Sequence, residues 1–117
     1  MNLTEVLKIF LPKEVAENFD LVDAKELETT NEVTELHLHL DEKFVYPNNH
    51  SAETLESKGF QKTVSICDFP IQGNRTILKI RKRRWVDKKN NKVISKRYDF
   101  KHKGTNYSKK LAAFLKE

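Results

Sequence analysis

The residues best suited to a chemical task lie in one strongly basic run in the second half of the chain. Residues 77–85 read Ile-Leu-Lys-Ile-Arg-Lys-Arg-Arg-Trp, so that cationic and apolar side chains alternate over the first part of the run. Arginine suits bidentate contact with phosphates or guanine edges, and lysine neutralises a phosphate backbone as a point charge. The run therefore predicts a surface that binds a polyanion.

The charge distribution along the whole chain supports this prediction. Residues 1–58 hold five Lys or Arg against thirteen Asp or Glu, whereas residues 59–117 hold seventeen against four. Such asymmetry is typical of a protein with a polyanionic partner. Two alternatives stay open. The basic stretch is a solvated face that keeps the protein soluble, or the acidic half packs against it and cancels much of its field.

A hairpin is the structure expected to carry these charges. Residues 75–86 and 93–100 alternate apolar and polar side chains, and the polar segment 87–92 between them predicts the turn. A two-stranded ribbon with a basic tip fits the major groove of DNA. Trp85 would stack on a base or a sugar, although a lone Trp on a strand is more often part of a core. The predicted DNA-binding residues are Lys79, Arg81, Lys82, Arg83, Arg84, Trp85, Lys88, Lys89, Lys92, Lys96 and Arg97.

The other chemically capable residues do not form a catalytic or metal-binding pattern. His37 and His39 share a strand face with Glu35 and Asp41, but solvent-facing alternation explains all four, and zinc needs a tight local set of ligands. Cys67, the one cysteine, stands next to a carboxylate, which opposes thiolate formation. No phosphate-binding glycine loop and no metalloprotease or serine-nucleophile motif is present. We expect a protein that is not an enzyme and uses no cofactor or metal.

The elements that must position the basic run indicate a mixed fold. Helical spacing of apolar residues predicts two short helices, residues 3–11 and 12–18, with Pro12 in the first turn of the second. A last helix begins at Thr105 or Ser108 and reaches Lys116. Five strands are predicted, over residues 19–28, 33–40, 59–70, 75–86 and 93–100. The fold class is therefore α+β, with short N-terminal helices, a mainly antiparallel sheet of about five strands with the basic hairpin, and a C-terminal helix.

Length and composition bound the class of protein. A chain of 117 residues suits one domain, 1–117, with an acidic half (1–58) and a basic half (59–117). No apolar run approaches the roughly 20 residues that span a bilayer. The first residues lack the basic and apolar regions of a secretory signal, and a single cysteine excludes an internal disulfide. We expect a cytoplasmic protein without membrane contact.

Several short motifs resemble a known family. The most specific are Asp68-Phe69-Pro70-Ile71-Gln72-Gly73 and Arg81-Lys82-Arg83-Arg84-Trp85. The likeness extends over the chain through Leu7-Lys8-Ile9-Phe10-Leu11-Pro12, Ser57-Lys58-Gly59-Phe60, Lys103-Gly104-Thr105 and Ala112-Ala113-Phe114-Leu115-Lys116. On these motifs the chain resembles the N-region protein encoded just ahead of the transposase in a group of bacterial insertion sequences. The resemblance implies a non-catalytic DNA-binding protein that recognises the ends of a mobile element, with double-stranded DNA and a separately encoded catalytic transposase subunit as partners.

More distantly, the same order of motifs resembles the amino-terminal region of larger insertion-sequence transposases. In those relatives a basic Arg-Arg-aromatic strand leads into a zinc-binding Cys-x-x-Cys hairpin, and a separate Asp-Asp-Glu domain cuts DNA. Residues 86–92 contain no cysteine, so zinc binding does not carry over. The alternative function is a protein-interaction or regulatory domain whose basic ribbon docks on an acidic protein surface without touching nucleic acid.

Overall fold

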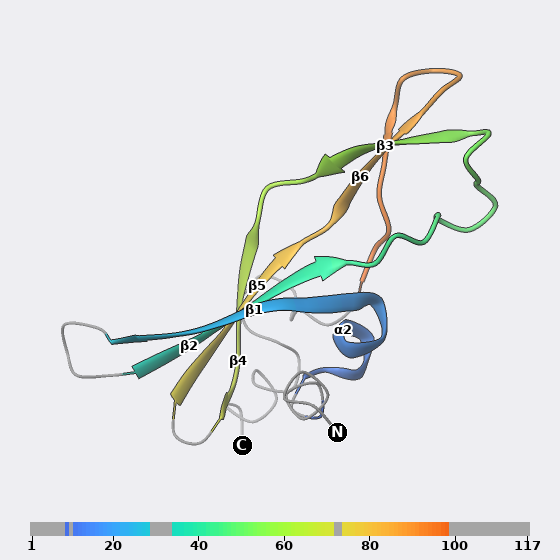
Figure 1. Cartoon of the computed structure of the whole chain (residues 1–117). Helices are drawn as coiled ribbons and strands as arrows, with labels where there is room; N and C mark the ends of the chain where they lie inside the picture. The colour runs from blue at the N-terminus through green and yellow to red at the C-terminus, as the bar shows by residue number, and fades with distance from the viewer. Residues whose placement is uncertain (1–8, 10, 29–33, 72–73, 99–117) are drawn as a thin grey trace.

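A computed structural model describes residues 9, 11–28, 34–71 and 74–98 of the chain. Over these residues the fold is mostly β, and two sheets follow one six-residue helix, α2 (Lys13–Asn18) (Figure 1). The strands in chain order are β1 (Phe19–Glu28), β2 (Thr34–Glu42), β3 (Leu55–Phe60), β4 (Val64–Ile71), β5 (Asn74–Arg81), β6 (Arg83–Asp87) and β7 (Val93–Ile94).

The expected α+β class is therefore wrong. The one helix among the described residues is too short to form a layer of its own, and strands make up most of the rest. It lies within the predicted segment 12–18, and Pro12 precedes it as the N-cap, where a missing N–H breaks no helical hydrogen bond. The predicted C-terminal helix and most of the predicted helix over residues 3–11 lie outside the described residues.

The larger sheet has the strand order β1-β2-β5-β4. Two antiparallel pairs, β1–β2 and β4–β5, are joined through a parallel pairing of β2 with β5 at its centre. The pairings are mainly antiparallel, as expected, but this central pair is parallel, because the chain leaves the sheet after β2, forms β3 elsewhere and returns as β4 and β5. Alternation of side chains is the same in parallel and antiparallel strands, so it carries no information on direction.

The segment predicted as one strand over residues 75–86 is broken at Lys82 into β5 and β6. The backbone N–H of Arg83 donates to Oε1 of Glu42 over 2.7 Å instead of to a neighbouring strand. The carbonyl of Lys82 accepts a hydrogen bond from the Gln61 N–H at 2.8 Å. The chain therefore passes from the larger sheet into the smaller one at a point held by the Glu42 side chain.

The smaller sheet has the order β3-β6-β7 and carries the predicted basic hairpin. The hairpin is confirmed by the antiparallel pairing of β6 with β7, and its turn is closed by the Asp87 N–H, which donates to the Lys92 carbonyl. Its return strand is shorter than predicted, Val93–Ile94 instead of residues 93–100. β3 was not predicted as a separate strand, because its sequence, Leu-Glu-Ser-Lys-Gly-Phe, lacks β-branched residues.

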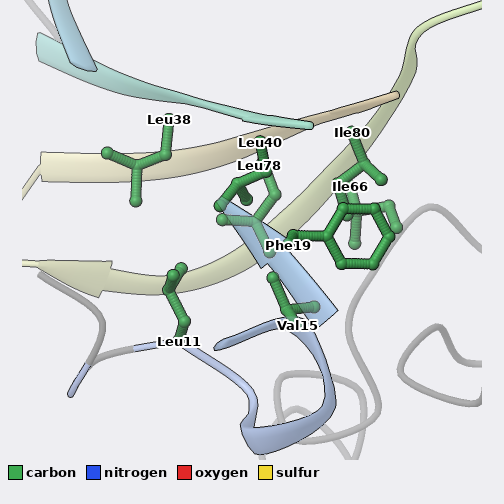
Figure 2. Close-up of a cluster of buried hydrophobic side chains, with 8 residues drawn as sticks. All are labelled: Leu11, Val15, Phe19, Leu38, Leu40, Ile66, Leu78 and Ile80. Atoms are coloured by element: carbon green, nitrogen blue, oxygen red, sulfur yellow. The ribbon is translucent and has the colours of Figure 1, made fainter. Parts of the chain in front are cut away.

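The main core fills one face of the larger sheet. Its buried members come from α2 and the residues just before it, the start of β1, and the sheet strands β2, β4 and β5. They are Leu11, Val15, Phe19, Leu38, Leu40, Ile66, Leu78 and Ile80 (Figure 2). The smaller sheet has its own buried pair, Leu55 and Trp85. The opposite face of the larger sheet carries polar side chains, among them Asp41 and Arg81.

Candidate nucleic-acid interface

Charge is divided between the two sheets. The four strands of the larger sheet hold four Lys or Arg against eight Asp or Glu. The smaller sheet and its hairpin, residues 55–60 and 83–98, hold eight Lys or Arg against two Asp or Glu. The asymmetry that lies between two halves of the sequence therefore becomes an asymmetry between two parts of one molecule, with the positive field on the smaller sheet.

On the larger sheet, the cations of β5 face partners from neighbouring strands. Arg81 forms a bidentate ion pair with Asp41, its Nε and Nη2 each 2.7 Å from a carboxylate oxygen. Hydrogen bonding to Asp41 raises the pKa of the Arg81 guanidinium above its ordinary value. Nη1 of Arg75 lies 3.6 Å from Oε2 of Glu35, and Nζ of Lys79 donates a hydrogen bond to Oγ of Ser65 over 2.7 Å. For this face, packing of acidic β2 against basic β5 does cancel part of the field.

At the junction of the sheets, Arg83 is used structurally. Its Nε donates to the carbonyl of Glu42 over 3.0 Å, and its guanidinium carbon lies 4.9 Å from the ring centre of Phe44 and 4.7 Å from that of Phe60. Nζ of Lys82 lies 5.8 Å from the Tyr98 ring centre. Both cations are half-buried. Their charge contributes to the field of this region, but the Arg83 side chain is held in place by the protein.

Trp85 does not reach the surface. It is 0% exposed, and its ring packs against Tyr46 at 4.8 Å and Phe44 at 5.2 Å between ring centres. Its Nε1 is buried without a hydrogen-bond partner among the described residues. Trp85 therefore takes the core position that a lone Trp on a strand more often has, and two aromatic side chains from the 43–47 segment cover the indole.

The remaining predicted cations lie on β6, in the hairpin turn and in the segment that follows β7. Arg84, Lys88, Lys89, Lys92 and Arg97 are exposed, and Lys96 is half-buried. Lys88 donates from Nζ to the Ala52 carbonyl over 2.7 Å. The side chains of the other five form no ion pair or hydrogen bond with any residue that the structure describes. These six cations, Arg84, Lys88, Lys89, Lys92, Lys96 and Arg97, are called the hairpin cations below.

Two aromatic residues of this region, Phe44 and Phe60, are not among the residues predicted from the sequence to bind DNA. Phe44 is 55% exposed and lies beside Arg83, although it belongs to no strand. Phe60 ends β3 and carries the guanidinium of Arg81 at 4.1 Å from its ring centre. Phe60 could have been suspected from the sequence only because it is an aromatic residue in the same half of the chain as the basic run. Phe44 could not, because no local pattern places it next to residues some forty positions later.

The residues that the structure describes hold no group of three or more His, Cys, Asp or Glu that could bind a metal ion, and Nε2 of His37 lies 3.1 Å from Oε1 of Glu35. No helix over the same residues is both long and apolar enough to cross a membrane. Comparisons of the chain with protein-family models, with curated proteins and with solved structures gave no match.

Proposed function

We propose that the chain is a non-catalytic DNA-binding module whose contact surface is the smaller sheet with its hairpin. One observation carries the proposal: the hairpin cations are free of carboxylate partners among the described residues, whereas Arg75 and Arg81 of the larger sheet are paired. Cations without an internal carboxylate partner bind phosphates at a small cost in free energy, because no ion pair within the protein has to be broken.

The motifs that resemble the N-region of insertion-sequence transposases supply the setting for this proposal. In that setting the chain recognises the ends of a mobile element in the cytoplasm, and a separately encoded catalytic subunit cuts the DNA. The carboxylates of the acidic strands β1 and β2 repel the phosphates, so these strands then face away from the DNA. This leaves the larger sheet for contact with a protein partner.

Salt dependence of duplex binding tests the proposal. If the six hairpin cations each neutralise one phosphate, log K should fall against log salt with a slope of about −5. The variant Arg84→Gln/Lys89→Gln/Lys92→Gln removes three of these charges and should flatten the slope by about 3. A duplex carrying the terminal repeats of a candidate parent element, compared with random sequence, shows whether this module alone recognises the ends.

A matched control removes the same charge elsewhere. Lys13, Lys25 and Lys62 are exposed and lie outside the smaller sheet, so Lys13→Gln/Lys25→Gln/Lys62→Gln should leave the slope unchanged. Equal flattening by both triple variants would show only nonspecific attraction to a basic protein. Absence of salt-dependent DNA binding, with tight binding to an acidic protein surface, would support the protein-interaction alternative.

A further inference from the structure

Cations and aromatic rings alternate at the junction of the two sheets. The guanidinium of Arg81 lies over Phe60 at 4.1 Å, and that of Arg83 lies 4.7 Å from Phe60 and 4.9 Å from Phe44. We call this series, Arg81–Phe60–Arg83–Phe44, the arginine–aromatic ladder. Its members come from β5, β3, β6 and the segment after β2, so the ladder forms only when both sheets are assembled.

Phe44 forms the exposed end of the ladder. It is 55% exposed, and Val45 beside it is 54% exposed. Its ring is nevertheless held in position: it packs edge-on against Trp85 at 5.2 Å and against Tyr46 at 5.5 Å. Since Trp85 is fully buried, the exposed ring rests on a rigid base. An aromatic ring held in this way loses little conformational entropy when it accepts a stacking partner.

We propose that Phe44 is a stacking platform for an unpaired DNA base, next to the guanidinium of Arg83, while the hairpin cations contact the backbone. Rings combined with neighbouring cations are the usual means of binding single-stranded nucleic acid, because every base has a π-face and every nucleotide a phosphate. Bases within a duplex already stack on one another, so Phe44 would engage a frayed or overhanging end. This inference rests on the proposed function, and it specifies that the DNA partner carries an unpaired end.

Binding to duplexes with different ends tests the inference on the full chain. The probes are one short labelled duplex with a blunt end, with a single-stranded thymine overhang, and with an overhang of the same length made of abasic sites. The abasic overhang carries the same phosphates without bases, so it isolates stacking from charge. Wild-type protein should bind the thymine overhang at least about fivefold more tightly than the abasic one.

Two variants assign the preference to Phe44. Phe44→Leu keeps apolar volume over Trp85 but removes the ring face, and it should abolish the thymine preference while leaving abasic binding and its salt slope unchanged. Phe44→Tyr should retain the preference, and Val22→Ala, at an exposed apolar residue of β1 in the larger sheet, should not change it. Trp85, the one tryptophan in the chain, should change fluorescence with the thymine overhang in the wild type and not in Phe44→Leu.

The possible failures separate the two proposals. Equal wild-type binding to thymine and abasic overhangs, with a steep salt slope on both, overturns the stacking platform and leaves the DNA-binding proposal standing. A thymine preference that survives in Phe44→Leu also overturns it. Failure to bind any of the probes in a salt-dependent way overturns both proposals together, as would a preference for poly-glutamate over every DNA probe.

Discussion

Asp41 and Arg81 face each other across the parallel pairing of β2 with β5, and two hydrogen bonds of 2.7 Å join the carboxylate to the guanidinium. The pair brings an acidic residue from the first half of the chain onto the basic run of the second half. It therefore divides the run into two kinds of cation. Arg81 is neutralised within the protein, whereas Arg84, three positions later, is exposed and outside the larger sheet.

Replacing these two arginines one at a time should separate their roles. Arg84→Gln should flatten the salt slope of duplex binding by about 0.9, the value for one lost phosphate contact. Arg81→Gln should leave the slope unchanged and lower the free energy of unfolding by less than about 1 kcal/mol, because the ion pair it breaks is partly exposed. Binding titrations over a salt series and urea denaturation measure the two effects. Equal flattening by Arg81→Gln would place the DNA surface on the larger sheet.

Trp85→Phe should lower stability and leave duplex binding unchanged, whereas Arg84→Gln should weaken the salt dependence of duplex binding. The indole is fully buried between the smaller sheet and the rings of Phe44 and Tyr46. Truncating it leaves a cavity and should lower the free energy of unfolding by about 1–3 kcal/mol, with affinity for blunt duplex DNA unchanged in the folded protein. Denaturation and binding measured on the same sample check both parts. Weaker duplex binding without a loss of stability would show that the indole contacts DNA directly.

Tyr98→Phe should destabilise the protein in a pH-dependent way. The Tyr98 hydroxyl donates to Oε2 of Glu42, a residue that is only 2% exposed. The pKa of Tyr98 is raised above its ordinary value near 10, mainly by burial of the side chain and secondly by this hydrogen bond. At neutral pH the variant leaves one buried carboxylate oxygen without its donor, and it should lower the free energy of unfolding by about 1–2 kcal/mol.

The direction of the pH effect follows from the raised pKa. Above about pH 10 the unfolded wild-type chain releases the Tyr98 proton while the folded protein retains it, so the contribution of Tyr98 to stability falls as the pH rises. The difference between wild type and Tyr98→Phe should therefore be full at about pH 8 and smaller at about pH 11. Taking the difference removes the titration of lysines that both proteins share. A difference that stays constant over this range would contradict the buried hydrogen bond to Glu42.

Local patterns predicted the strands better than the way they pair. The segment 19–28 is β1 as predicted, and the alternation around Leu36, Leu38 and Leu40 does place leucines on the core side of β2. The break at Lys82 was not predictable, because the carboxylate that holds it belongs to Glu42, forty-one positions before Arg83. The parallel pairing was missed for the same reason: strand direction depends on residues far away in the chain.

For the candidate site, the sequence by itself determined the identity and density of the cations, since composition and spacing are local properties. It also determined that they would be carried on a hairpin, through the polar turn between two alternating segments. Only the tertiary structure decided which of them remain free. Asp41 neutralises Arg81 across forty positions, and the 43–47 segment buries Trp85 while leaving Phe44 exposed. Burial and ion pairing are contacts between distant segments, so they are settled when the sheets assemble.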